Sequence, residues 1–195
     1  MHQRLSSENS LLVVIDVQER LLPAIQNQQQ ILFNVRRLLE GTRLLGVPVI
    51  VSEQYPQGLG STVKELIPHI LEGTAVLSKK SFSIYDDECI RTEINARKRT
   101  QIILCGIEAH VCVLQSAFDI LRVGGHEVYI VADAIGSRFA SDREMALRRF
   151  ETSGMVCTTT ESLLFEWCRS AEHPQFKEIS RLVKESVNGR TNDAF

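Results

Sequence analysis

Three side chains that could together carry out covalent hydrolysis, Asp16, Lys79 and Cys112, each follow a short apolar segment of the sequence. A cysteine thiolate is a nucleophile, and a neighbouring carboxylate can take the thiol proton and later return it to a leaving group. A lysine ammonium close to the sulfur favours the ionised thiol. This combination indicates a site for acyl transfer or hydrolysis, provided that the fold brings the three residues together.

Cys112 differs from the other cysteines because it lies where an apolar segment gives way to a helical pattern. We expect it in the first turn of a helix, where the helix partial charge lowers the pKa of a thiol. It is about 200° around that helix from Leu114, away from the apolar stripe. Backbone N–H groups at a helix start can also hold a developing oxyanion. The remaining cysteines are interpreted as packing residues: Cys89, Cys105, Cys157 and Cys168.

Other interpretations of these residues stay open at this point. Asp16 could be a turn residue or a helix cap, and Lys79 and Lys80 could be a solvated pair on the surface. The chain could be a non-catalytic binding or scaffold protein. It could also be a thiol redox sensor, in which Cys105 is the only sequence-near partner for a disulfide with Cys112.

The elements that must position these residues alternate between apolar and amphipathic segments. The apolar segments are Leu11–Ile15, Val47–Val51, Ala75–Leu77, Gln101–Cys105, Glu127–Val131 and Met155–Thr158. Most are continuous and rich in β-branched residues, which is typical of strands covered on both faces. The stretches between them have helical spacing, as in residues 31–45, which Gly46 can end as a C-cap.

This alternation predicts a single α/β domain, a doubly wound, Rossmann-like, six-stranded parallel sheet with helices on both faces. Ligands of such sheets bind beyond the carboxyl ends of the strands, where the strand order reverses. The domain spans residues 1–195, with a core of about 11–185 and flexible ends at 1–9 and 186–195. Two capping-box patterns, beginning at Ser141 and Thr158, predict the starts of two helices.

Composition and motifs exclude several classes of partner. The chain has 22 Lys and Arg against 24 Asp and Glu, so it lacks the basic excess of a nucleic-acid-binding protein. Its apolar runs are far shorter than the roughly 20 residues of a membrane span. The five cysteines lack a CxxC pair, zinc spacing is absent, and no phosphate-binding glycine motif follows a strand. We therefore expect a cytoplasmic protein with reduced thiols, without metal or other cofactor, that acts on a small-molecule substrate.

Three segments resemble the isochorismatase-like hydrolase superfamily, which includes the nicotinamidases. They are LLVVIDVQ (Leu11–Gln18), VLSKKSFS (Val76–Ser83) and GIEAHVCV (Gly106–Val113). The resemblance extends from about residue 11 to residue 167. SEQYPQGLG (Ser52–Gly60) is similar to the branch of isochorismatase domain-containing proteins.

The resemblance implies an Asp-Lys-Cys triad that cleaves an amide-like C–N bond through a thioester. Asp16 is then the general base and acid, Lys79 stabilises the thiolate, and Cys112 is the nucleophile. Lys79 matches the family spacing to Phe82 and Ser83, whereas Lys80 does not.

The resemblance also implies a cis peptide bond between Ile107 and Glu108, and an oxyanion hole formed by the N–H groups of Glu108 and Cys112. Members of the superfamily are commonly oligomeric, so it implies a homo-oligomer. Candidate pocket residues are Gln18, Tyr55, Phe82, Glu108 and His110.

Departures from the family pattern narrow the range of candidate substrates. Residues 52–56 contain no histidine, which argues against the metal site of nicotinamidases. Cys112 argues against isochorismate, because cleavage of a vinyl ether does not need a thiol. Ala109 replaces a threonine that many amidases have. The side chain of Glu108 could select a cationic or hydrogen-bond-donating substrate, or Glu108 could contribute only its backbone.

Overall fold

The computed structural model describes residues 4–186 and contains one parallel sheet of six strands. The strands are β1 (Ser10–Ile15), β2 (Val49–Gln54), β3 (Ala75–Lys79), β4 (Gln101–Ile107), β5 (Glu127–Gly136) and β6 (Val156–Thr158). Their order across the sheet is β3-β2-β1-β4-β5-β6, and every neighbouring pair is parallel. The order reverses between β1 and β4, so a ligand site is expected beyond their carboxyl ends.

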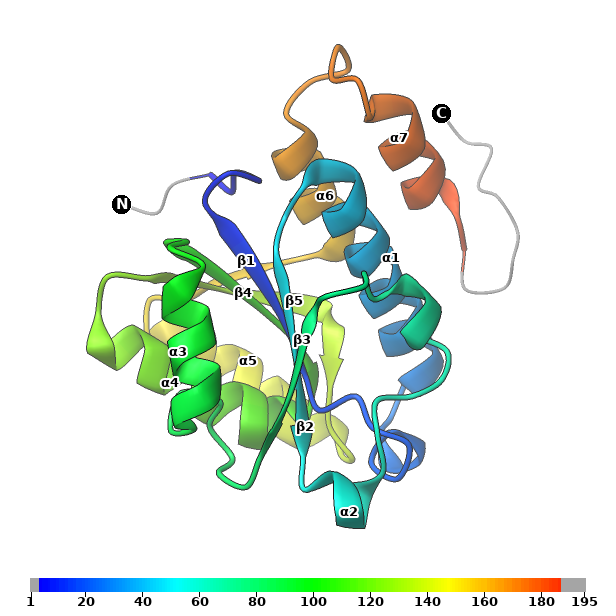
Figure 1. The fold of residues 1–195 in the computed structure, drawn as a ribbon. Helices are drawn as coiled ribbons and strands as arrows, with labels where there is room; N and C mark the ends of the chain where they lie inside the picture. Colours follow the sequence, from blue (N-terminus) through cyan, green and yellow to red (C-terminus); the bar gives the residue numbers. More distant parts are fainter. Residues whose placement is uncertain (1–3, 187–195) are drawn as a thin grey trace.

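Helices cover both faces of this sheet (Figure 1). One face carries α1 (Gln28–Leu45), α6 (Thr160–Cys168) and α7 (Phe176–Lys184), and the other carries α3 (Glu88–Ala96), α4 (Leu114–Val123) and α5 (Ala140–Thr152). Short turns complete the fold: α2 (Pro56–Leu59), the 3-10 turns η1 (Leu22–Ala24) and η2 (Ile67–His69), and the π-helical turn η3 (Ala109–Val113). The predicted single domain with a doubly wound, six-stranded parallel sheet is confirmed.

The central strands are apolar apart from Ser10 and Gln101 at their starts, because helices bury both of their faces. Every residue of β1 and β4 is buried. Successive side chains of a strand point to opposite faces. In β1, Leu12 and Val14 therefore pack toward α1, whereas Leu11, Val13 and Ile15 pack on the side of α3–α5. Within residues 4–186, the structure has no helix that is long and apolar enough to cross a membrane.

Residues 4–9, which the sequence predicts to be flexible, contact the body of the domain. Leu5 is buried, and its N–H donates to Glu166 Oε2 at 2.8 Å. The N–H of Ser6 donates to Gln101 Oε1 at 2.9 Å. These contacts hold the segment to the body of the domain. Residues 1–3 and 187–195 lie outside the described residues, so the prediction for those parts is not tested.

The two predicted capping boxes are wrong, although both helices exist. Helix α5 begins at Ala140, after an extended Phe139, which places Ser141 inside the helix. The N-cap of α6 is Thr159, whose side chain accepts from the N–H of Ser162. At α6 the physical reason is a tertiary contact.

At α6, that contact comes from Asp133 on β5. Its Oδ1 accepts from both the N–H and the Oγ1 of Thr160, which fixes the helix start one residue later than the local pattern indicates. The predicted C-cap Gly46 is confirmed, with a left-handed φ of 68°.

Candidate active site

Asp16 lies directly after β1, fully buried, with a left-handed backbone. Its φ of 54° is uncommon for a residue other than glycine and is held by the surroundings. The Asp16 N–H donates to Ser52 O at 3.1 Å, which continues the ladder to β2. The carboxylate accepts from Ser52 Oγ at 2.7 Å on Oδ1 and from Lys79 Nζ at 2.6 Å on Oδ2. Asp16 is thus a buried carboxylate held by a hydroxyl and an ammonium.

Lys79 is the last residue of β3, and its side chain is completely buried. Its ammonium donates to Asp16 Oδ2 at 2.6 Å, to Gln54 Oε1 at 2.7 Å and to Ser81 O at 3.3 Å. Three acceptors match its three protons. Lys80 is exposed, so the interpretation of the two lysines as a solvated pair is wrong for Lys79.

Cys112 lies in the π-helical turn η3, which precedes α4. The N–H of Val113 donates to Glu108 O across this wide turn, and Ser116 Oγ donates to Cys112 O at 2.5 Å. Cys112 is only 6% exposed and packs in the apolar cluster on the side of α3–α5. The prediction that it points away from apolar residues is wrong, because the apolar cluster extends beyond its own helix and includes residues of the sheet such as Ile15.

The pKa of the Cys112 thiol is raised to about 12. Burial is the largest cause, and the negative charge of Asp16 adds to it. Lys79 lowers the pKa but does not outweigh these effects. The expected lowering of this pKa by a helix start is therefore corrected: the resting thiol is protonated at neutral pH.

Gly106 allows β4 to approach β1, the strand that Asp16 follows. It pairs with Ile15 in the sheet, and its φ is 113°. A Cβ at this position would lie 2.0 Å from Ile15 O, so no other residue fits without movement of the backbone. The peptide bond between Ile107 and Glu108 is cis, at the position that the resemblance implies.

Gln18 fixes the backbone near the site. Its Nε2 donates to Gln54 O at 3.0 Å and to Gly60 O at 2.6 Å, and its Oε1 accepts from the N–H of Gln54 at 2.7 Å. Gln18 is fully buried. Its amide therefore ties the loop after β1 to the end of β2, a role that differs from the pocket contact expected from the sequence.

Glu108 and His110 flank Cys112 along the chain and have protein partners of their own. Glu108 Oε2 accepts from the N–H of Arg138 at 3.2 Å and from its Nε at 3.1 Å. His110 Nδ1 is 3.0 Å from Ser137 Oγ, and its Nε2 is 3.7 Å from Asp142 Oδ2. The carboxylate of Glu108 is thus already bound to a guanidinium, which weakens the case for a cationic substrate.

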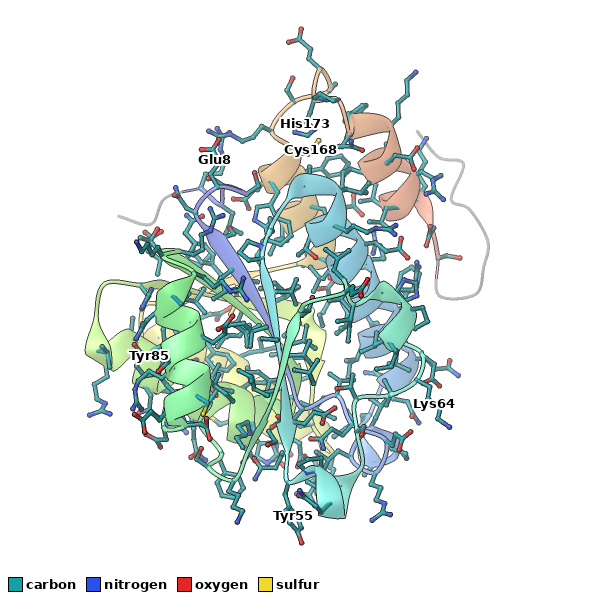
Figure 2. All side chains as sticks on the ribbon, in the orientation of Figure 1. Glu8, Tyr55, Lys64, Tyr85, Cys168 and His173 are labelled. Carbon is teal, nitrogen blue, oxygen red and sulfur yellow. The ribbon has the colours of Figure 1, made fainter. Side chains whose placement is uncertain are left out.

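The two candidate aromatic residues of the pocket are exposed. Tyr55 is 51% and Phe82 is 54% exposed. Figure 2 shows Tyr55 projecting outward beside α2. A cavity of about 460 Å³ extends between Tyr55, Lys79 and the start of α3. Tyr55 and Lys79 therefore both line this cavity on the β3 side, whereas Asp16 and Cys112 do not.

The other four cysteines lie in different surroundings. Cys105 and Cys168 are buried and Cys157 is half-buried, whereas Cys89 is exposed, so its assignment as a packing residue is wrong. Cys105 packs on the side of α1, across the sheet from Cys112. This separation argues against a disulfide between them. Within residues 4–186 no group of three or more His, Cys, Asp or Glu side chains could hold a metal ion.

Two residues of the site, Ser52 and Gln54, were not predicted to contact Asp16 and Lys79. Ile15 pairs with Ser52, and Gln54 pairs with Lys79. Only this strand register reveals that they contact Asp16 and Lys79. The sequence of β2 does contain a signal for these contacts. Ile50, Ser52 and Gln54 lie on the same face of the strand, and this face changes from apolar to polar toward the carboxyl end.

The doubly wound sheet, with polar groups gathered beyond the carboxyl ends of β1, β3 and β4, defines an α/β protein whose candidate site lies where a ligand is expected, at the reversal of strand order. The family model "Isochorismatase domain" matches residues 10–162. Isochorismatase domain-containing protein 2A of Mus musculus is 42% identical over 185 residues, which cover 94% of this chain and 87% of that protein. The chain therefore belongs to the isochorismatase domain family.

Solved structures share the fold. The structure of MAR1 Ribonuclease from Caenorhabditis elegans has a TM-score of 0.88 and 38% identity, and the match covers 99% of this chain and 97% of that one. The YcaC gene product of Escherichia coli, an octameric hydrolase of unknown specificity, has a TM-score of 0.88 and 21% identity over 94% of this chain and 91% of its own. Family and fold support a hydrolase of the isochorismatase-like superfamily.

Proposed function

We propose that this chain is a cysteine hydrolase that cleaves an amide-like C–N bond of a small molecule through a thioester. The observation that carries the proposal is the fully buried ion pair between Lys79 Nζ and Asp16 Oδ2, 2.6 Å apart, beside the Cys112 thiol. A buried ion pair costs desolvation energy that apolar residues would avoid, so it contributes little to stability. Its place next to a thiol is what nucleophilic catalysis requires.

In the first half of the reaction, Cys112 Sγ attacks the substrate carbonyl carbon while its proton passes to Asp16. The developing oxyanion is held by the N–H groups of Glu108 and Cys112. The C–N bond then breaks, and Asp16 returns the proton to the leaving nitrogen. In the second half, Asp16 takes a proton from water as the water oxygen attacks the thioester, and the departing sulfur takes that proton back. The products are an amine and a carboxylic acid.

The raised pKa of Cys112 supports proton transfer during the attack rather than before it. A thiol with a pKa of about 12 is almost entirely protonated at neutral pH. A base in contact with it is therefore essential, and Asp16 is the carboxylate whose charge and hydrogen bonding act on this thiol.

The test is amine release from a panel of small amides by wild-type protein and by Cys112→Ala. We expect Cys112→Ala to lose turnover by at least about a thousand-fold, as when a nucleophile is removed, with an unchanged fold. Cys89→Ala, on the exposed surface, is the matched control and should keep full activity. Wild-type activity in Cys112→Ala would overturn the mechanism.

We infer a backbone role for Glu108, because Arg138 already binds its carboxylate. Glu108→Gln should then leave the ranking of neutral and cationic amides unchanged. A selective loss of cationic substrates would assign the side chain a role in selectivity.

A second candidate activity, ribonuclease, comes from the 38% identity to the Caenorhabditis elegans protein. Acidic residues outnumber basic ones in this chain, so strong electrostatic attraction to RNA is not expected. RNA cleavage that is equal in wild type and Cys112→Ala would favour this activity over the thiol mechanism. Tight binding of a small molecule without turnover would favour a binding protein.

We also propose that the chain forms a homo-oligomer, supported by the shared fold with the octameric Escherichia coli protein. Light scattering coupled to size-exclusion chromatography measures this, and a mass near 22.0 kDa would contradict it. The free cysteines suit a reducing compartment, which supports a cytoplasmic location.

A further inference from the structure

The carboxyl end of β2 provides two neutral side chains to the buried charges of the candidate site. Ile50, Ser52 and Gln54 share one face of this strand, because alternate side chains of a strand point the same way. Ile50 packs in the apolar cluster on the side of α3–α5. Ser52 and Gln54 follow it, and they hydrogen bond to Asp16 and Lys79, respectively. On this face of β2, apolar packing by Ile50 is therefore followed by hydrogen bonds to the buried charges of Asp16 and Lys79.

The amide of Gln54 is fixed in one orientation. Its Oε1 accepts from Lys79 Nζ at 2.7 Å, and its Nε2 donates to Lys80 O at 2.8 Å. An ammonium can only donate and a carbonyl can only accept, so the two ends of the amide cannot exchange. The Gln54 backbone is fixed as well, because Gln18 binds both its N–H and its C=O. The acceptor for Lys79 is thus held at a defined position.

Gln54 satisfies the Lys79 ammonium without adding charge. Of the three acceptors of Lys79, only Asp16 is negatively charged. An unpartnered N–H on a fully buried ammonium would cost free energy. A second carboxylate at this position would add another negative charge near Cys112. A neutral amide accepts this hydrogen bond and adds no second negative charge.

We propose that Gln54 is a positioning residue that holds Lys79 Nζ against Asp16 and, through Lys79, determines how readily Cys112 reacts. The inference rests on the proposed function only in assigning Cys112 as the nucleophile. Without the amide acceptor, the buried ammonium loses one of its three hydrogen-bond partners. Its charged form is then less stabilised, and its position is less restricted. Lys79 favours the thiolate, and its influence on Cys112 should therefore weaken.

The test measures the rate at which iodoacetamide alkylates Cys112, from neutral to alkaline pH, by peptide mass spectrometry. The proteins are the wild type, Gln54→Met, Lys79→Met and the double variant, and the exposed Cys89 is the internal reference in each. We expect Gln54→Met to slow the alkylation of Cys112 about five-fold at neutral pH and to move its pH profile upward, as the loss of one hydrogen bond to a charged group predicts. In the Lys79→Met background the same change should have no effect.

Two results would overturn the proposal. One is an unchanged rate in Gln54→Met. The other is equal slowing in both backgrounds, which would mean that Gln54 acts through packing and not through Lys79. Gln54→Asn, whose shorter amide does not reach Lys79, replaces Gln54→Met if urea unfolding shows that the latter is not folded. Gln29→Met, on the exposed surface of α1, is the matched control.

The labelling needs no substrate, so its result is separate from that of the proposed function. Retained turnover in Cys112→Ala would remove the hydrolase mechanism, whereas the coupling of Gln54 to Cys112 through Lys79 would still be measurable.

Discussion

At Cys112, burial and the Asp16 carboxylate both oppose ionisation of the thiol, whereas Lys79 favours it. The same carboxylate is the acceptor to which the thiol proton passes in the proposed reaction. The two effects of Asp16 can be separated experimentally. Its charge acts on the resting thiol, and its basicity acts only while bonds form and break.

Asp16→Asn should make Cys112 easier to alkylate but unable to turn over substrate. Removing the negative charge lowers the Cys112 pKa, so more thiolate is present at a given pH. We expect alkylation at neutral pH to rise by about ten-fold, equivalent to roughly one pKa unit. The pH dependence of iodoacetamide labelling measures this, and amine release measures the loss of turnover. Lys79→Met should move the labelling in the opposite direction, and slower labelling in Asp16→Asn would contradict the assignment.

At the scale of elements, the site depends on the close approach of β4 to β1. Gly106 makes this approach possible, because its φ of 113° and the nearby Ile15 carbonyl leave no room for a Cβ. The approach places the cis bond and η3 next to Asp16. It thereby brings together two strands, each of which is followed by one member of the proposed triad.

Gly106→Ala should destabilise the domain by about 3 kcal/mol or more, since it combines an unfavourable φ with a backbone clash. Gly124→Ala is the matched control. Gly124 also has a positive φ, of 79°, but no atom lies within 4 Å of its added Cβ. We expect that change to cost only about 1 kcal/mol. Urea unfolding of both variants measures the difference, and equal losses would show that the approach of β4 to β1 is not tight.

Elements that depend on burial were predictable, whereas those that depend on tertiary contact were not. The continuous, β-branched apolar segment at residues 11–15 is typical of a strand covered on both faces, and its alternation with helical stretches predicts the sheet. The start of α6 depends on Asp133, which is distant in sequence and invisible to a local capping rule. The surroundings of Cys112 likewise depend on tertiary contact, because burial and the Asp16 carboxylate raise its pKa, and neither is visible in the local helical pattern.

For the whole molecule, thiol and phenol groups whose pKa is raised by burial predict that the free energy of unfolding falls at alkaline pH. Burial raises the pKa of Cys112 to about 12 and that of Cys157 to about 11, and it also raises the pKa of Cys105 and Tyr129. In the unfolded chain these thiols ionise near pH 8.5. Their contribution is fully present below that pH and is lost as the pH rises toward the folded pKa, because only the unfolded state releases the protons.

We expect the free energy of unfolding to decrease from about pH 9 upward, by as much as about 1.4 kcal/mol per pH unit for each such thiol. Urea unfolding over an alkaline pH series measures the slope. Cys105→Ala should reduce the slope while lowering stability at every pH through the cavity it leaves. A free energy that stays constant well above pH 9 would contradict the assignment of these thiols as buried and protonated.

The strand order also determines when during synthesis the domain can assemble. β1 is translated first but lies at the centre of the sheet, where Ser10 pairs with Gln101 of the much later β4. Until β4 has left the ribosome, a nascent sheet of β1, β2 and β3 ends in β1 as a free edge of apolar residues, which can pair with other chains. Asp16 and Lys79 are by then already made, but Cys112 is not. The translation of β4 and the turn after it is therefore the step that both closes this aggregation-prone edge and completes the candidate site.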